Sequence, residues 1–160
     1  MSGRGPSNHY NYKSMNKDNC IKICNKLLRG ERSAVETYAK AIEKHAGETS
    51  AIPELTRLRG EHAAAVKTLE ENVRSMGGTP DLESGAWGTF ANTVQSTANL
   101  FGPESAISAL AAGEKHGLND YESALKDDDM MPECRTMVQT KLLPPIREHL
   151  TTLERLAKTA

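Results

Sequence analysis

The chain of 160 residues carries 20 Lys and Arg against 21 Asp and Glu, for a formal net charge of −1, and only 4% of its residues are aromatic. A chain of this length suits one domain with a single core, and so balanced a charge excludes the basic surface that nucleic acid or an anionic membrane would require. The few aromatic residues and the long stretches without Gly or Pro indicate an all-α protein.

The first fifteen residues, MSGRGPSNHYNYKSM, are rich in Ser, Gly and Asn, and they predict a disordered tail over residues 1–15. They lack the apolar stretch of a signal peptide, and no apolar run long enough to span a membrane follows, so we expect a cytoplasmic protein without a membrane partner. Three cysteines without metal-type clustering are typical of reduced thiols. Cys20 and Cys24 lie one helical turn apart and are expected to pack as small apolar side chains.

Four long helices are predicted next. The first runs from about residue 16 to 45, and the second begins near Pro53 and ends at Gly77–Gly78. The third begins at Pro103, and the fourth begins at Pro132 and continues to the C-terminus. Pro144–Pro145 should kink this last helix, because proline removes a backbone donor and clashes with the preceding turn.

The segment between the two helical hairpins is long. Its apolar residues, Trp87, Phe90, Val94 and Phe101, are spaced as in a short helix. We therefore expect residues 16–160 to form a four-helix bundle, in which hairpins 16–77 and 103–158 are joined by a crossover over residues 78–102 that contains a short helix.

The two hairpins repeat one pattern. The sequence GERSAVETY at residues 30–38 returns as GEKHGLNDY at residues 113–121, so that a glutamate and a tyrosine recur at the same spacing. In the partner helices, RGEH at residues 59–62 corresponds to IREH at residues 146–149. Each hairpin is therefore predicted to be one copy of the same unit.

The repeated polar residues fall on apolar helix faces. By helical periodicity, Glu31, Glu114, His62 and His149 all point into the core. Two buried carboxylates need compensation, and a divalent ion held by two Glu oxygens and two His nitrogens provides it. The sequence thus predicts an iron, manganese or zinc site with these four ligands.

A second interpretation stays open. In it the protein is a metal-free scaffold or interaction protein, and Arg59 pairs with Glu31 or Glu114 in a buried polar network. Tyr38 and Tyr121 lie on the same faces, either as hydrogen-bond donors to the site or as apolar rings with their hydroxyl groups near the core boundary.

The paired Gly-Glu-x6-Tyr motifs and the paired inward histidines resemble the ferritin-like superfamily. The resemblance spans residues 16–158 and is to the neighbourhood of rubrerythrin and of bacterial families built from two similar hairpins. It implies a metal site at the bundle centre, with Glu31, His62, Glu114 and His149 as ligands. It also implies two iron or manganese ions and oxidase, peroxidase or storage chemistry.

The chain departs from that pattern at the bridging carboxylates. Dinuclear sites of this class use Glu-x-x-His on two helices, but Arg59 and Ile146 stand three residues before the two histidines. One metal ion is therefore expected instead of two. Glu61 and Glu148, directly before the histidines, are expected to face solvent or a neighbouring groove. A homodimer is compatible with the mixed-charge surface, although no heptad seam requires it.

Overall fold

The computed structural model describes residues 7–44, 50–84 and 103–159. This part of the chain is helical and contains no strand, which confirms the all-α prediction. Its elements are α1 (Ser7–Lys44), α2 (Ile52–Ser75), α4 (Pro103–Leu125), α5 (Pro132–Met137), the π-helical turn η1 (Val138–Leu142) and α6 (Leu143–Thr159). Since α5, η1 and α6 follow one another without a break, they form a single rod, and the described chain consists of four rods.

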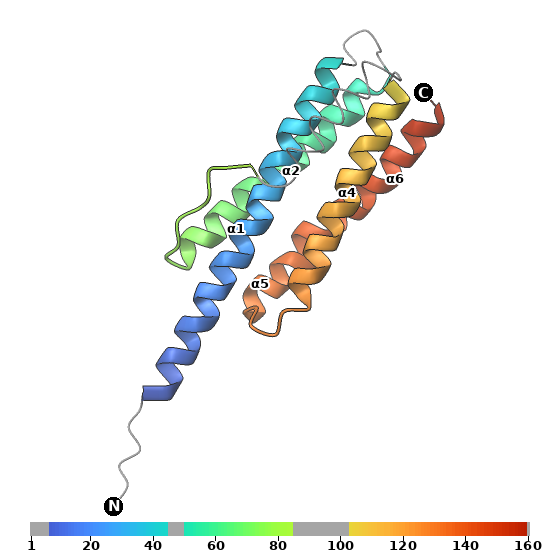
Figure 1. Cartoon of the computed structure of the whole chain (residues 1–160). Coiled ribbons are helices and arrows are strands. Elements are labelled where there is room, and N and C mark those ends of the chain that lie inside the picture. Colours follow the sequence, from blue (N-terminus) through green and yellow to red (C-terminus); the bar gives the residue numbers. More distant parts are fainter. Residues whose placement is uncertain (1–6, 45–49, 85–102, 160) are drawn as a thin grey trace, which may run out of the picture.

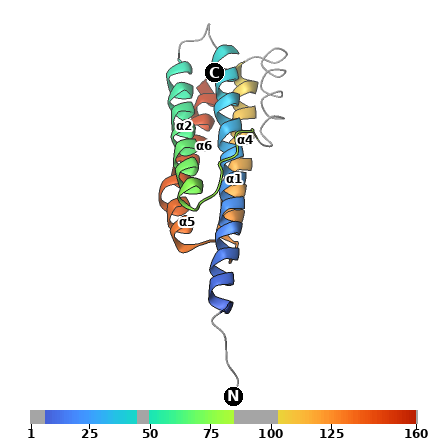
Figure 2. The ribbon, with the colours of Figure 1, turned by 90° about the vertical axis from the view of Figure 1, so that its left-hand side faces the viewer.

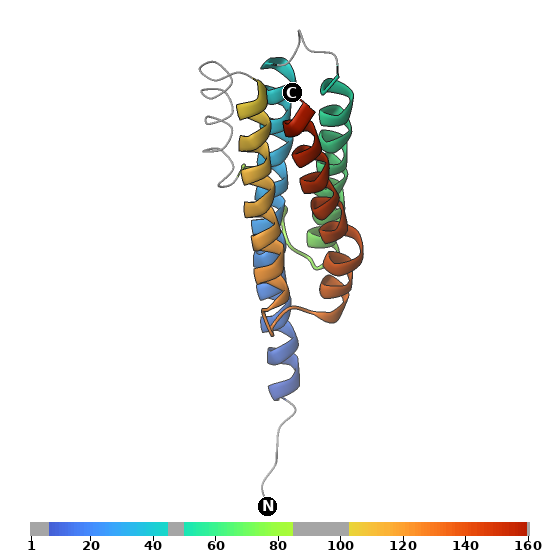
Figure 3. The same ribbon diagram turned by 90° about the vertical axis from the view of Figure 1, so that its right-hand side faces the viewer.

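The four rods lie along a common axis (Figures 1, 2 and 3). Helix α1 packs mainly against α2, and α4 packs mainly against α6, so each predicted hairpin is present. Helix α1 also packs against α4, to which it runs antiparallel (Figure 1). Helix α2 ends at one end of the bundle and α4 begins at the other, so the chain between them joins opposite ends. The short helix predicted in this crossover lies within residues 85–102, outside the described residues.

Helix α1 starts earlier than the sequence analysis predicted. It begins at Ser7 instead of near residue 16, and its N-terminal turns extend beyond the other helices (Figure 1). Residues 7–15 contain neither Gly nor Pro, whereas Gly5 and Pro6 directly precede the helix. The helix therefore propagates backwards from its packed part until it meets these two residues.

The end of α2 is fixed by two glycines. Gly77 has φ +82°, a left-handed conformation that a side chain disfavours, and the Gly78 N–H donates to the Val73 carbonyl at 3.0 Å. Gly78 also lies against α1, since a Cβ atom there would approach Ile21 Cγ2 to 2.8 Å. The predicted stop at this pair is confirmed.

The irregularity predicted at Pro144–Pro145 takes the form of the π-helical turn η1, immediately before them. The two prolines cannot donate to the carbonyl groups four residues earlier, at Thr140 and Lys141. A π-helical turn accommodates such a break, and turns of this kind are frequent at functional sites. This one lies about two to three helical turns before His149 on the same rod.

The core has two apolar parts with a polar layer between them. One part contains Tyr38, Leu55, Ile107 and Leu153, near the end at which α4 begins. The other contains the three cysteines and lies near the turn between α4 and α5. Between them lies what we call the polar layer, Glu31, His62, Glu114 and His149. None of the described helices is long and apolar enough to cross a membrane.

Candidate metal centre

Each of the four long helices contributes one residue to the polar layer. Glu31 comes from α1, His62 from α2, Glu114 from α4 and His149 from α6, and their exposed fractions are 4%, 2%, 0% and 1%. Helical periodicity put these residues on the core faces, and the structure brings them to one level of the bundle. The predicted convergence of two acidic and two imidazole side chains is therefore present.

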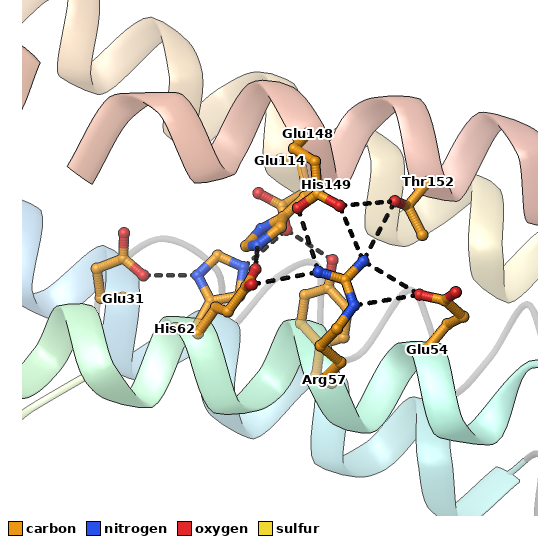
Figure 4. Close-up of polar contacts among 10 residues, drawn as sticks. Glu31, Glu54, Arg57, His62, Glu114, Glu148, His149 and Thr152 are labelled. Carbon is orange, nitrogen blue, oxygen red and sulfur yellow. Dashed lines mark hydrogen bonds and ion pairs between the residues drawn. The ribbon is translucent and has the colours of Figure 1, made fainter. Parts of the chain in front are cut away.

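Glu114 is the centre of the layer (Figure 4). Its Oε1 atom lies 2.7 Å from His62 Nε2 and 3.1 Å from His149 Nδ1. Tyr38 donates its hydroxyl proton to the same oxygen at 2.6 Å. The other carboxylate oxygen, Oε2, is buried and has no hydrogen-bond partner in the described chain. Glu114 Oε2 is thus a buried hydrogen-bond acceptor without a partner, and burying such an acceptor costs free energy of folding.

The outer nitrogen of each imidazole faces a second carboxylate. His62 Nδ1 lies 2.6 Å from Glu31 Oε2, and His149 Nε2 lies 2.5 Å from Glu61 Oε2. The rings of the two histidines approach edge to face, with centroids 4.7 Å apart. Each histidine is therefore held in place by an outer carboxylate and directs its inner nitrogen at Glu114.

Without a metal, His62 carries a proton on both nitrogens, because ionised carboxylates only accept hydrogen bonds. Burial lowers the pKa of His62, but the charges of Glu114 and Glu31 outweigh it and raise the pKa to about 10. Burial likewise raises the pKa of Glu114, and the charge of His62 together with hydrogen bonds from both histidines brings it down to about 2. The metal-free layer thus contains an imidazolium between two carboxylates.

The two repeat tyrosines cross between the hairpins. Tyr38 of the first hairpin donates to Glu114 of the second, and Tyr121 of the second donates to Glu31 of the first, each at 2.6 Å. The crossing follows from the antiparallel pairing of α1 and α4, which sets the glutamate of one helix beside the tyrosine of the other. Burial and the nearby carboxylates raise the pKa of both tyrosines well above the usual value, so both stay protonated donors. Of the two roles considered from the sequence, the donor role is the one observed.

Three of the four predicted ligands have the spacing of a metal site. Ligand atoms of His62, Glu114 and His149 all lie within 4.8 Å of one another, and all three residues are buried. Glu31 lies on the far side of the His62 ring, where it accepts from Nδ1. The sequence pattern identified all four residues but did not separate these two positions.

Arg59 does not belong to the polar layer. It is exposed, and the carboxylates of Glu31 and Glu114 are paired with tyrosine and histidine side chains. The predicted pairing of Arg59 with one of these glutamates is therefore wrong. Three helical residues turn by about 300°, so Arg59 lies about 60° away from His62, which is enough to bring it to the solvent side.

Glu61 has a contact that the sequence analysis did not predict. Its side chain is 37% exposed, but its carboxylate lies 2.5 Å from His149 Nε2, between α2 and α6. Its repeat counterpart, Glu148, is 52% exposed and is paired with Arg57 at 2.9 Å, as expected for a residue facing solvent. Arg57 also reaches Glu61 at 3.2 Å. The sequence held one indication of this contact. Glu61 directly precedes the inward-facing His62, and a rotation of about 100° per residue directs its side chain toward α6.

A pocket of about 180 Å³ leads to the layer from the groove between α2 and α6. Its lining includes Glu31, His62 and His149 of the polar layer, together with Lys141 and Leu142 of the π-helical turn. Ala64 and Ala65 of α2 also line the pocket. The pocket therefore borders both histidines.

The fold and this site define an all-helical bundle protein with a buried His/Glu cluster of metal-binding spacing. A family model described as a domain of unknown function, DUF2383, matches residues 19–127, and the chain belongs to this family. The matched region includes Glu31, His62 and Glu114 and ends before His149. No curated protein and no solved structure matches the sequence.

Proposed function

We propose that this protein binds one divalent metal ion in the polar layer, through His62 Nε2, His149 Nδ1 and the carboxylate of Glu114. In this proposal Glu31 and Glu61 accept from the outer nitrogens and fix the tautomer of each histidine, as carboxylates commonly do for metal-bound imidazoles. The observation that carries the proposal is the convergence of both inner nitrogens on Glu114, whose Oε2 atom has no other partner in the described chain.

The donor set fits an ion in size and chemistry. Atoms that each lie about 2 Å from one ion are at most about 4 Å apart, and the three ligand groups lie within 4.8 Å. Closing them around an ion would therefore need movements of about 1 Å or less. Two histidines and one carboxylate with open positions suit iron(II), and the same donors accept manganese and zinc.

Charge favours one ion over two. A single divalent ion replaces the proton of His62 as the positive charge between Glu31 and Glu114. A second ion would need the bridging carboxylates of a Glu-x-x-His pattern, but Arg59 is exposed and Ile146 is apolar and buried at those positions. The proposed site is therefore mononuclear.

We further propose that the bundle is of the ferritin-like kind. The antiparallel pairing within each hairpin supports this, as does a connection that joins opposite ends of the bundle (Figure 1). A bound metal ion would supply Lewis-acid or redox chemistry at its open positions. The chain would supply the tyrosine and carboxylate contacts that orient the ligands and the pocket that admits small molecules. An oxidoreductase or metal-handling role follows from this combination.

The test is metal content together with three matched glutamate variants. Protein purified without chelators should carry close to one iron, manganese or zinc ion per chain, and removing it with EDTA should lower the melting temperature, because the ion binds only the native state. Glu114→Gln should abolish this response. Glu31→Gln should weaken binding by roughly 10- to 100-fold, because it removes only an orienting contact. Glu148→Gln, an exposed change on the helix of His149, should leave binding unchanged.

One observation favours the metal-free alternative. Apart from Glu114 Oε2, no buried side-chain nitrogen or oxygen in the described chain lacks a partner, so the polar layer is nearly self-sufficient. Such a network would serve a scaffold or interaction protein by fixing how the hairpins pack. Negligible metal after chelator-free purification, combined with a melting temperature that ignores both added metal and EDTA, would leave only this alternative.

A further inference from the structure

The pocket between α2 and α6 extends along these helices, away from the polar layer. Thr68 follows His62 on α2, and Lys141 precedes His149 on the rod of α5, η1 and α6. Because α2 and this rod run antiparallel (Figure 1), Thr68 and Lys141 lie on the same side of the layer. At the helical rise, Thr68 is roughly 9 Å and Lys141 roughly 12 Å from it. All four residues line the pocket, which therefore has one end at the histidines and the other at Thr68 and Lys141.

The end at Thr68 and Lys141 offers one positive charge and one hydroxyl group. Lys141 is the only lysine or arginine among the residues that line the pocket, and it makes no ion pair within the described chain. The Thr68 hydroxyl group likewise makes no hydrogen bond there. Lys141 is exposed and Thr68 is half-buried. An ammonium group beside a hydroxyl group suits an anionic ligand with oxygen atoms.

The end at the polar layer repels an anion. Glu31 and Glu61 line it, and their charges face the layer: Glu31 accepts from Tyr121, and Glu61 lies 2.5 Å from His149 Nε2. The lining between the two ends is apolar, and its residues are Ala64, Ala65, Leu142, Pro145 and Ile146. Each of these stands between the residues of the two ends in sequence, on α2 or on the rod. The pocket thus suits a molecule with an anionic group at one end and a hydrocarbon chain toward the layer.

We propose that this pocket binds a small aliphatic carboxylic acid, with its carboxylate at Lys141 and Thr68 and its hydrocarbon end beside His62 and His149. For its role the inference rests on the proposed function, in which the acid is the substrate class of the metal centre. A lysine ammonium is a single point charge, so it balances a carboxylate, whereas a phosphate group carries up to two negative charges. A cavity of about 150 Å³ holds one benzene molecule. The volume of about 180 Å³ therefore limits the acid to roughly five to eight carbon atoms.

The first experiment is calorimetric titration of the full-length, EDTA-treated protein with hexanoate at pH 7. The wild type should bind one hexanoate per chain. Hexanol, which has the same chain length without the charge, should bind roughly tenfold more weakly or less. Lys141→Met keeps the apolar stem and should weaken hexanoate binding by roughly 10- to 100-fold, because a hydrogen bond between charged groups is lost.

The matched control is Lys67→Met. Lys67 is exposed and directly precedes Thr68 on α2, but it does not line the pocket. This variant should bind hexanoate within about twofold of the wild type, because exposed charges outside the pocket are screened by solvent. Absence of hexanoate binding, equal affinity for hexanol, or unchanged affinity in Lys141→Met would each overturn the proposal.

A second measurement tests the orientation of the acid. In protein loaded with manganese(II), the ion speeds the magnetic relaxation of nearby ligand protons, and this effect falls steeply with distance. The terminal methyl protons of hexanoate should therefore relax faster than the protons next to its carboxylate. The reverse order would mean that the carboxylate binds at the metal, and it would refute the assignment to Lys141.

This proposal and the proposed function fail separately. Protein that takes up no iron, manganese or zinc but binds hexanoate through Lys141 would refute the metal centre and support the carboxylate site. Protein that takes up one of these metals but does not bind hexanoate would support the metal centre and refute the carboxylate site.

Discussion

The two crossed tyrosines make unequal contributions to stability, and this inequality can be measured. Tyr121 is the hydrogen-bond donor to Glu31 Oε1 in the described chain. Tyr38 shares Glu114 Oε1 with two histidine nitrogens. Replacing either tyrosine with Phe keeps the buried ring and removes only the hydroxyl group. The change therefore tests the hydrogen bond without creating a large cavity.

The expected magnitudes follow from what each carboxylate retains. A hydrogen bond to a charged group contributes about 1.5 to 3 kcal/mol, and leaving a buried acceptor unpaired costs its full desolvation. Tyr121→Phe strands Glu31 Oε1, so its free energy of unfolding should fall by about 2 to 3 kcal/mol. Tyr38→Phe leaves Glu114 Oε1 with both histidines, so the fall should be about 1 kcal/mol. For a chain of this length, the larger change lowers the melting temperature by roughly 4 to 12 °C.

The assay is urea unfolding of the metal-free protein at pH 7 with EDTA present, followed by circular dichroism. The slope with urea should be the same for both variants and the wild type, since the exposed surface does not change. If Tyr38→Phe proves the more damaging of the two, or if Tyr121→Phe stays within about 0.5 kcal/mol of the wild type, the assignment of these hydrogen bonds is incorrect.

Three further outcomes are expected. In EDTA, the free energy of unfolding should be greatest between about pH 4.5 and pH 6.5, and a maximum above pH 8 would contradict this. The lowered pKa of Glu114 stabilises the fold above pH 4.5, and this contribution is lost as the pH falls toward 2. The raised pKa of His62 stabilises the fold below pH 6.5, and this contribution is lost as the pH rises toward 10. Gly77→Ala should lower the free energy of unfolding in urea by about 1 to 2 kcal/mol, because Gly77 has φ +82° and a side chain disfavours this left-handed conformation. An unchanged free energy of unfolding would mean that α2 ends differently. Arg57→Gln should change the same free energy by less than about 1 kcal/mol, because its ion pairs are partly exposed; a larger loss would show that Arg57 also holds Glu61 in position.

Much of the fold was accessible from the sequence because helix periodicity and helix ends are local properties. The 3.6-residue period put Glu31 and Glu114 on core faces. Gly77 and the prolines marked where helices stop or change. The early start of α1 was missed because composition suggested a disordered tail. Residues 7–15 contain no residue that breaks a helix, and packing further along α1 stabilises it.

The contacts within the polar layer could not be predicted from the sequence in the same way. The sequence by itself determined that one glutamate, one histidine and one tyrosine of each hairpin face inward, since a repeated period fixes direction. Only the tertiary structure decided that Glu31 holds the outer nitrogen of His62, that Glu61 reaches His149, and that Arg59 turns to solvent. These outcomes depend on which helices are neighbours and on their axial offset, and long-range packing sets both quantities.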